Sequence, residues 1–367
     1  MVVDQGVPLL TEAMAGTGGL IKVEPEDFCV EEVPSYEPCG QGPHLYLWVE
    51  KTNLPAEVAL RRLGQRFECR PGDVGQAGIK DTRARSRQWF SVVDEAGRWS
   101  AEADPAEMDL GPGLRVLRVS RHGNRLKTGH LRGNSFDVLV REAHPEGLER
   151  AVRIMAEIQA RGLPNFYGPQ RFGRDGGNVT TGLALLRGER GAGRAAHDRF
   201  VKRLVISAVQ SHVFNRVLAH RMAVGLLHTV LEGDRMVRLD SGGRFEVQDP
   251  AAEQERFDRR EVVHTAPMPG HRIGWAGGAA GQMEREGAAG LGIEPGDFKR
   301  FGKLALGARR ESLIFPADIS VEADSDGVRV RFLLPRGAYA TTVLGELMKS
   351  PTASLEASSE IDEVLEA

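Results

Sequence analysis

Residues 75–92 (GQAGIKDTRARSRQWFSV) hold one carboxylate among several cations. The acid is Asp81, and the cations are Lys80, Arg83, Arg85 and Arg87. Nearby positive charge favours the ionised form of an acid and attracts a polyanion such as RNA. A charged Asp in a cationic cleft suits a nucleophile or a general base. The same residue could instead cap a turn after Gly78 by accepting backbone N–H groups, so the local sequence leaves two interpretations open.

A second basic stretch covers residues 111–136, which contain no acid. Its charge comes from Arg and Lys side chains with two histidines: Arg115, Arg118, Arg121, Arg125, Lys127 and Arg132, with His122 and His130. Such a block suits a phosphate-binding surface, although a charged edge strand would show the same composition. Asn134 and Phe136 close the stretch and offer an amide that can read a base edge and a ring that can stack on a base.

Length and composition set the class of protein. The chain has 367 residues, enough for two domains, and 41% hydrophobic with 27% charged residues is typical of globular proteins. A formal charge of −3 argues against a globally basic nucleic-acid binder, so any such function must rest on a local patch. No apolar run is long enough for a membrane span.

Cysteine and histidine usage predicts neither disulfides nor a metal site. The odd cysteine count without CxxC spacing indicates a reducing cytoplasm; the residues are Cys29, Cys39 and Cys69. The helically spaced histidines have no carboxylate at ligand spacing; they are His212, His220 and His228. We therefore expect a cytoplasmic protein without a bound metal.

Periodicity predicts a mixed α/β chain, with strands towards both ends and helices in the middle. Expected strands cover residues 21–23, 28–33, 44–51, 114–120, 135–141, 318–323 and 328–334. Expected helices cover residues 55–64, 147–161, 194–227 and 341–348. In the helix 147–161 we expect an apolar core stripe of Leu148, Val152, Met155 and Ile158. The acidic residues 350–367 are expected to be disordered.

Five motifs in order resemble the tRNA pseudouridine synthase D (TruD) family. They are KVEPEDFCVEE (22–32), GIKDTRARSRQWFSV (78–92), LRGNSFDVLVRE (131–142), GLPNFYGPQRFG (162–173) and FLLPRGAYATTVLGEL (332–347). Two details depart from the family pattern: Gly345 precedes Glu346-Leu347 where REL is usual, and residues 82–85 replace a bulkier middle. Neither change touches Asp81.

The resemblance implies a reaction and a set of site residues. Members of this family isomerise a uridine of tRNA, typically uridine 13 in the D arm, to pseudouridine, with the Asp of the GxKD motif as catalytic residue, here Asp81. By position, Phe28, Asn134 and Tyr339 match substrate-contacting residues. Phe136 matches a ring near the target base, and Lys22 matches a basic residue near the acid. No metal or cofactor is implied, and the partner is tRNA. The RNA-backbone candidates are Lys80, Arg83, Arg121, Arg125, Lys127 and Arg171.

The family fold implies an α/β (α+β) architecture. A pseudouridine-synthase-like core of mixed, largely antiparallel β-sheet with flanking helices would comprise residues 1–161 and 315–349. An inserted α/β TruD-type domain would comprise residues 162–314, with a positively charged cleft between the two. Because this cleft forms within one chain, we expect a monomer.

Two other classes of protein remain as alternatives. An RNA-binding or chaperone protein could use the basic stretches without chemistry. A hydrolase of glycosidic bonds would normally need a second carboxylate as general acid, and residues 75–92 supply only Asp81.

Overall fold

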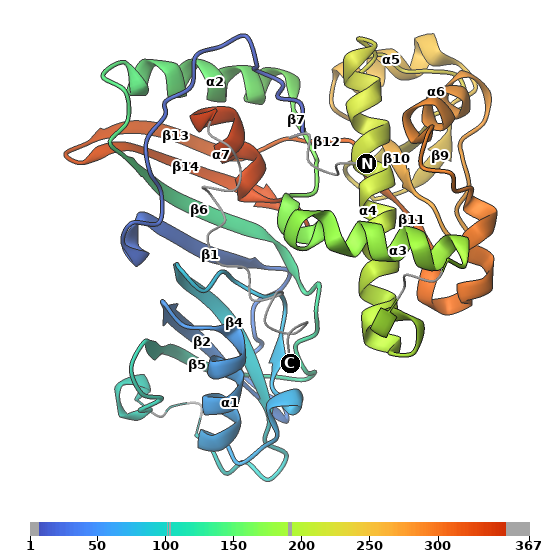
Figure 1. Ribbon diagram of the computed structural model, residues 1–367. Coiled ribbons are helices and arrows are strands. Elements are labelled where there is room, and N and C mark those ends of the chain that lie inside the picture. The colour runs from blue at the N-terminus through green and yellow to red at the C-terminus, as the bar shows by residue number, and fades with distance from the viewer. Residues whose placement is uncertain (1–6, 101, 103, 190–192, 350–367) are drawn as a thin grey trace.

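The computed structural model describes residues 7–100, 102, 104–189 and 193–349. The acidic stretch 350–367 lies outside the described residues. The chain forms two parts side by side, each built on its own β-sheet (Figure 1).

The larger sheet is mixed and largely antiparallel, as the sequence predicts. In the described residues its order is β13 (Ala317–Asp324), β14 (Gly327–Pro335), β6 (Leu131–Arg141), β1 (Phe28–Pro34), β4 (Arg85–Val93), β2 (His44–Thr52) and β5 (Leu114–His122), with β3 (Gly75–Gln76) also paired to β4. The pair β1 and β4 is parallel, and the other paired neighbours are antiparallel. Strands from both ends of the chain therefore meet in one sheet.

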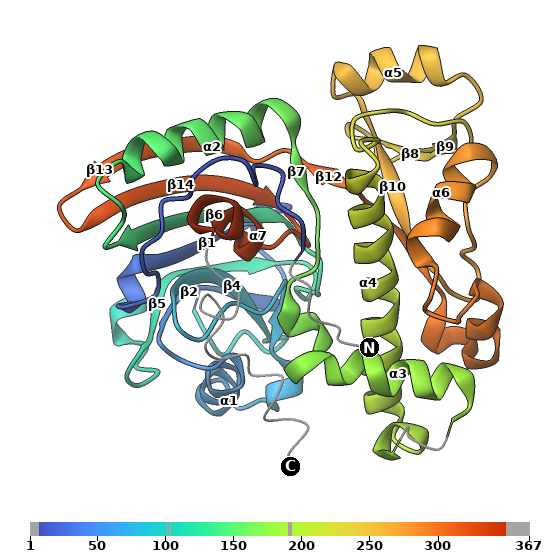
Figure 2. The same ribbon diagram turned by 45° about the horizontal axis from the view of Figure 1, so that its top comes forward.

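One face of this sheet is covered by three helices, α1 (Ala56–Arg66), α2 (Gly147–Arg161) and α7 (Ala340–Met348) (Figure 2). Side chains alternate along a strand, so Val30 shares this face with its register partners Phe136 and Ser86. Near β14, apolar side chains of α2 and α7 pack on the face, whereas α1 packs over β2 and β4. The helices α2 and α7 thus cover one end of this face, and α1 covers the other end.

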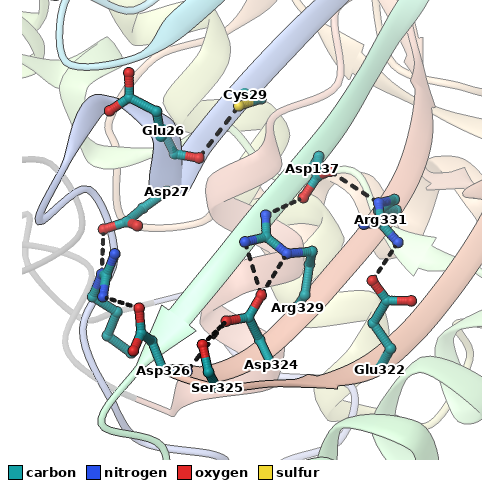
Figure 3. Close-up of polar contacts among 11 residues, drawn as sticks. Glu26, Asp27, Cys29, Asp137, Glu322, Asp324, Ser325, Asp326, Arg329 and Arg331 are labelled. Carbon is teal, nitrogen blue, oxygen red and sulfur yellow. Dashed lines mark hydrogen bonds and ion pairs between the residues drawn. The ribbon is translucent and has the colours of Figure 1, made fainter.

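The opposite face of β6, β14 and β13 is polar (Figure 3). Asp137 on β6 accepts hydrogen bonds from Arg329 and Arg331 of β14 at 2.8 and 2.9 Å. Arg331 also pairs with Glu322 of β13 at 2.7 Å, and Arg329 pairs with Asp324 at 3.0 Å. Cross-strand pairs of opposite charge stabilise a solvent-facing sheet surface.

The second part is continuous in sequence between β7 (Leu163–Pro164) and β12 (Leu313–Ile314), two short strands that pair with each other. Its sheet has the order β11 (Ala308–Glu311), β10 (Val262–Met268), β8 (Arg235–Arg238) and β9 (Arg244–Glu246). Its helices are α3 (Gly177–Arg187), α4 (Arg199–Ala223), α5 (Pro250–Asp258) and α6 (Gly278–Ala288). A 3₁₀ segment, Pro295–Ala305, follows α6. We refer to residues 163–314 as the central segment.

The long helix α4 is the axis of the central segment (Figure 1). It begins where the Asp198 carboxylate accepts the N–H groups of Phe200 and Val201, an N-cap arrangement. Gly182 of α3 and Gly287 of α6 lie so close to the α4 backbone that an added Cβ would approach it within 2.4 and 2.8 Å. These contacts fix α3 and α6 against α4.

Several sequence-based expectations are wrong in detail. Helix α2 has the expected bounds, but Leu148 and Val152 are 38% and 47% exposed, while Ala151 and Ile154 face the core. Met155 and Ile158 are buried as expected, so the expected stripe is correct in the second half of the helix and wrong in the first half. Residues 21–23 do not form a strand, since Lys22 has φ +57°. Within the described part of the chain, no helix combines the length and apolar character that a membrane crossing needs.

Candidate active site

Asp81 lies in the loop between β3 and β4, and buried side chains hydrogen-bond to the main chain of this loop. The buried ammonium of Lys51 donates to the main-chain oxygen of Asp81 at 2.7 Å and to that of Leu54 at 2.5 Å. The Gln88 side-chain amide donates to the main-chain oxygen of Gly78 at 3.0 Å. The Asp81 side chain itself is 47% exposed. The fold thus fixes the loop backbone and leaves the carboxylate available to a ligand.

The predicted partner Lys22 reaches this carboxylate. Its Nζ lies 3.2 Å from Asp81 Oδ1 and 4.3 Å from the centroid of the Phe28 ring. Lys22 adopts a left-handed backbone conformation, which typically costs a non-glycine residue about 1–3 kcal/mol. The flanking chain holds it there, because Leu20 pairs with Arg141 and a 3₁₀ turn, Pro25–Asp27, leads into β1.

A buried ion pair lies directly behind Asp81. Lys80 Nζ is 3.1 Å from Glu32 Oε2, and both side chains are almost fully buried. Burial raises the pKa of the Glu32 carboxyl, and the Lys80 ammonium and the Trp89 N–H offset this rise only in part. The expectation that Lys80 contacts an RNA backbone is therefore corrected: its ammonium faces the interior and anchors the residue next to Asp81.

The sequence analysis missed both Lys51 and Glu32, although the strand pattern contains a signal for each. Glu32 follows Phe28 and Val30 at alternate positions, and Lys51 follows Val49 in the same way. Side chains at alternate positions share a sheet face, so both charges had to point towards the core. A charge at a core position is rarely unpaired, which marks it as part of a polar site.

Three phenylalanines extend the site along the sheet. The rings of Phe28 and Phe136 lie edge to face at 6.1 Å, and those of Phe136 and Phe332 are stacked at 5.3 Å. All three rings are buried. The structure thus brings the predicted residues Phe28 and Phe136 together, with Phe28 next to Lys22.

Asn134 lies on β6 opposite Glu32 of β1 and Leu334 of β14. Its side-chain oxygen Oδ1 is buried and has no hydrogen-bond partner among the described residues. A buried acceptor without a donor costs about 1–3 kcal/mol, so such an atom is a natural site for a ligand N–H group.

Tyr339 belongs to a neighbouring cluster that joins the start of α7 to the central segment. Its ring centroid is 5.8 Å from that of Tyr167, and the Arg310 guanidinium lies 4.3 Å from the Tyr167 ring. Burial raises the pKa of the Tyr339 hydroxyl, although the nearby Arg171 and Arg310 oppose the rise. The hydroxyl is therefore protonated at neutral pH and can donate a hydrogen bond.

Of the remaining RNA-backbone candidates, two are exposed and three are held by contacts within the protein. Arg83 and Lys127 are exposed. Arg171 donates to Ser207 and Ser211 of α4, and Arg125 donates to the main-chain oxygen of Gly72. Arg121 is paired with the buried Asp94, so we assign Arg121 to the fold rather than to RNA contact.

The predicted histidine series does not gather into a ligand set. His220 pairs with Glu286 at 3.4 Å, and burial lowers the pKa of His212 to about 4. Across residues 7–349, in the parts that the structure describes, no three His, Cys, Asp or Glu side chains come together as they would around a metal ion.

Comparison with known proteins decides the family. A family model described as tRNA pseudouridine synthase D (TruD) matches residues 4–195 and 190–347. The chain belongs to this family. It is 47% identical over 346 residues to the tRNA pseudouridine synthase D of Anaeromyxobacter dehalogenans (strain 2CP-C), covering 94% of this chain and 97% of the relative. It is 39% identical over 342 residues to that of Thermus thermophilus, covering 93% and 92%.

A solved structure shows the same fold. The putative TruD from Methanosarcina mazei superposes with a TM-score of 0.76 over 95% of this chain and 98% of that one, at 24% identity. The family membership and the fold class expected from the five motifs are thus confirmed. The TruD motifs at 22–32 and 78–92 supply Lys22, Glu32 and Lys80, which lie around Asp81.

Proposed function

We propose that this TruD-family chain converts a uridine of tRNA to pseudouridine, with Asp81 as catalytic nucleophile. The observation that carries the proposal is the position of the Asp81 carboxylate. It is half exposed, 3.2 Å from the Lys22 ammonium, on a loop fixed by Lys51 and by the Lys80–Glu32 pair. A reactive group on a backbone held by buried contacts is oriented before substrate arrives.

The chemistry needs one such carboxylate. The bond between C1′ and N1 of the uridine breaks, the uracil turns, C1′ bonds to C5, the C5 hydrogen leaves as a proton, and N1 takes up a proton. As the nucleophile, Asp81 attacks the nucleoside and is later displaced; the alternative role of the same carboxylate is to remove a sugar proton that is later returned. The overall change is an isomerisation without oxidation or reduction, so it requires no redox cofactor.

The neighbours of Asp81 would hold the base. A uridine in a folded RNA must leave its stack to be reached by an enzyme. We propose that Asn134 Oδ1 accepts the uracil N3–H and that the Phe28 and Phe136 side chains form the apolar wall of the base pocket. The protonated Tyr339 hydroxyl would donate to the substrate from the side of the central segment.

The position of the substrate follows from the family. We propose uridine 13 in the D arm of tRNA as the target, with the exposed Arg83 and Lys127 among the phosphate contacts. We further propose a monomer, acting in the cytoplasm on tRNA, with a catalytic domain of residues 1–161 and 315–349 and an inserted domain of residues 162–314. The pairing of β7 with β12 supports this division, because the chain enters and leaves the central segment at one place.

The proposal is tested by mapping pseudouridine in treated RNA. An unmodified tRNA transcript is incubated with the protein, labelled with a carbodiimide that marks pseudouridine, and reverse transcribed. We expect one new stop, at uridine 13, and none in a matched transcript with cytidine at that position. A stop elsewhere would refute the target position but keep the reaction, whereas no stop on any tRNA would refute the function.

A further inference from the structure

A basic pocket lies on the central segment, on elements other than those that hold Asp81. It has a volume of about 420 Å³ and is lined by Arg199, Phe200, Arg203, Lys303 and Leu304. The first turn of α4 supplies one wall and the end of the 3₁₀ segment Pro295–Ala305 supplies the other. Both views place these elements at the opposite end of α4 from α5 (Figures 1 and 2).

The cations of this pocket are not neutralised by the fold. Within the described part of the chain, Arg199, Arg203 and Lys303 make no ion pair or hydrogen bond with a side chain. Other arginines of the central segment do have acidic partners, as Arg221 has Asp234 at 2.7 Å and Arg235 has Glu246 at 2.8 Å.

The acid next in sequence to the pocket does not change this. The Asp198 carboxylate accepts the Phe200 and Val201 N–H groups of the helix cap. Lys202, Lys299 and Arg300 add further positive charge on the same two elements. Like charges so close together repel each other, so the cluster favours an anionic ligand.

Phe200 adds an aromatic ring to this basic pocket. The ring is 62% exposed, although Phe200 is a large apolar residue in the first turn of a helix. It lines the pocket together with Arg199 and Arg203, and these two arginines, four residues apart, lie on one helix face. An exposed ring among cations suits single-stranded nucleic acid, because bases stack on the ring while phosphates meet the cations.

We propose that this pocket binds a nucleotide of the RNA substrate away from the target uridine. The phosphate lies among the Arg199 and Arg203 guanidinium groups and the Lys303 ammonium, and a base stacks on Phe200. This inference rests on the proposed function, since it takes the RNA substrate as ligand. Because the pocket lies on elements other than those around Asp81, we take this nucleotide to come from outside the arm that carries the target. The pocket therefore adds affinity for whole tRNA and none for an isolated D-arm hairpin.

The test compares Phe200→Ala and the double variant Arg199→Gln, Arg203→Gln with the wild type. Arg153→Gln is the control, because it removes an exposed helical arginine from α2, which covers the larger sheet and not the central segment (Figure 1). Binding of fluorescent tRNA transcript and of a D-arm hairpin is measured by anisotropy at several salt concentrations. Turnover is measured on both RNAs.

We expect each pocket variant to bind whole tRNA about tenfold more weakly with kcat unchanged, Phe200→Ala through the loss of base stacking and the double variant through the loss of phosphate contacts. The double variant should also show a flatter salt dependence, by about one unit of slope for each phosphate that the pocket no longer neutralises. Hairpin binding should be unaffected in every variant.

Three results would overturn the inference. Whole-tRNA affinity equal to that of the Arg153→Gln control would show that the pocket does not touch RNA. An equal loss on tRNA and hairpin would show a structural effect instead. Binding of a poly-glutamate peptide that depends on Arg199 and Arg203, with tRNA affinity unchanged, would assign the pocket to an acidic protein. A wild-type protein without turnover on any tRNA would refute the proposed function. The comparison of tRNA binding between the variants and the wild type would still test the pocket.

Discussion

The Lys22 ammonium bridges the Asp81 carboxylate, 3.2 Å away, and the face of the Phe28 ring, 4.3 Å from its centroid. Lys22 holds this position with a left-handed backbone conformation, φ +57°. A strained residue at a functional position indicates that its side-chain placement is required.

Replacement of Lys22 by Met should lower kcat about fivefold. The Asp81 side chain is half exposed, and an ion pair in such a setting contributes at most about 1 kcal/mol, which corresponds to that factor. Lys22→Arg keeps the positive charge and should restore most of the rate. Steady-state turnover on tRNA transcript measures both. Equal rates for Lys22→Met and Lys22→Arg would show that the charge does not assist Asp81.

Replacement of Lys51 by Met should loosen the loop that carries Asp81. The variant leaves the main-chain oxygens of Asp81 and Leu54 without this donor, which costs about 1–3 kcal/mol in the free energy of unfolding. Hydrogen exchange in residues 77–84 should become faster, and kcat should fall about tenfold with KM little changed.

The matched control for this prediction is Lys349→Met. Lys349 is a partly buried lysine that donates to Thr11 and pairs with Glu346. Its loss should lower stability without changing exchange in residues 77–84. If Lys51→Met behaves in the same way and retains full kcat, Lys51 has no role in positioning Asp81.

Asn134→Leu should separate activity from stability. The Oδ1 atom has no partner among the described residues, so an apolar side chain of similar size should leave the free energy of unfolding unchanged or slightly higher. Loss of the hydrogen bond to uracil N3–H should lower kcat/KM by about 5- to 150-fold, from about 1–3 kcal/mol. Urea unfolding and tRNA turnover provide the two readouts. A large loss of stability would instead mean that Asn134 serves the fold.

Arg121→Gln should affect stability rather than RNA binding. Burial alone would raise the pKa of the Asp94 carboxyl, but the Trp99 N–H, the Arg121 guanidinium and the Arg98 N–H outweigh it and lower the pKa. Because the folded pKa is lowered, the ionised carboxylate stabilises the fold above its unfolded pKa, about 3.9, and this contribution is lost as the pH falls through the folded value.

At pH 7 we therefore expect Arg121→Gln to lower the free energy of unfolding by about 3 kcal/mol, since it leaves a buried carboxylate short of a partner. The deficit should shrink below about pH 4 as Asp94 becomes protonated. Arg98→Gln, which removes only an exposed pair with Glu68, should change stability by no more than about 0.5 kcal/mol. A tRNA affinity that falls in Arg121→Gln while stability holds would return this residue to the RNA surface.

The positions of helices and strands can be predicted from the sequence better than which of their side chains are buried. Helix α2 and the hairpin of β13 and β14 follow from periodicity and turn residues, which act locally. The exposure of Phe200 could not be predicted, because a helical pattern does not say where the neighbouring elements end.

The site shows the same limit. Asp81 with Lys22 could be expected from motifs, and the structure places them in contact. The inward direction of Lys80 could not, because it depends on Glu32, 48 positions away in sequence, reaching the same point from β1. From composition alone, Lys80 and Glu32 would both be expected at the surface, as most charged residues are.

The most direct test of the account is tritium release from tRNA transcript labelled at uridine C5. The new bond to C5 must expel that hydrogen, so release reports the isomerisation itself. Asp73→Asn is the matched control for Asp81→Asn, because Asp73 is also a partly exposed acid paired with a cation, at 2.8 Å from Arg70. We predict release by the wild type and Asp73→Asn, and none by Asp81→Asn despite retained tRNA binding. Release by Asp81→Asn at the wild-type rate would contradict the assignment of Asp81 as the catalytic residue.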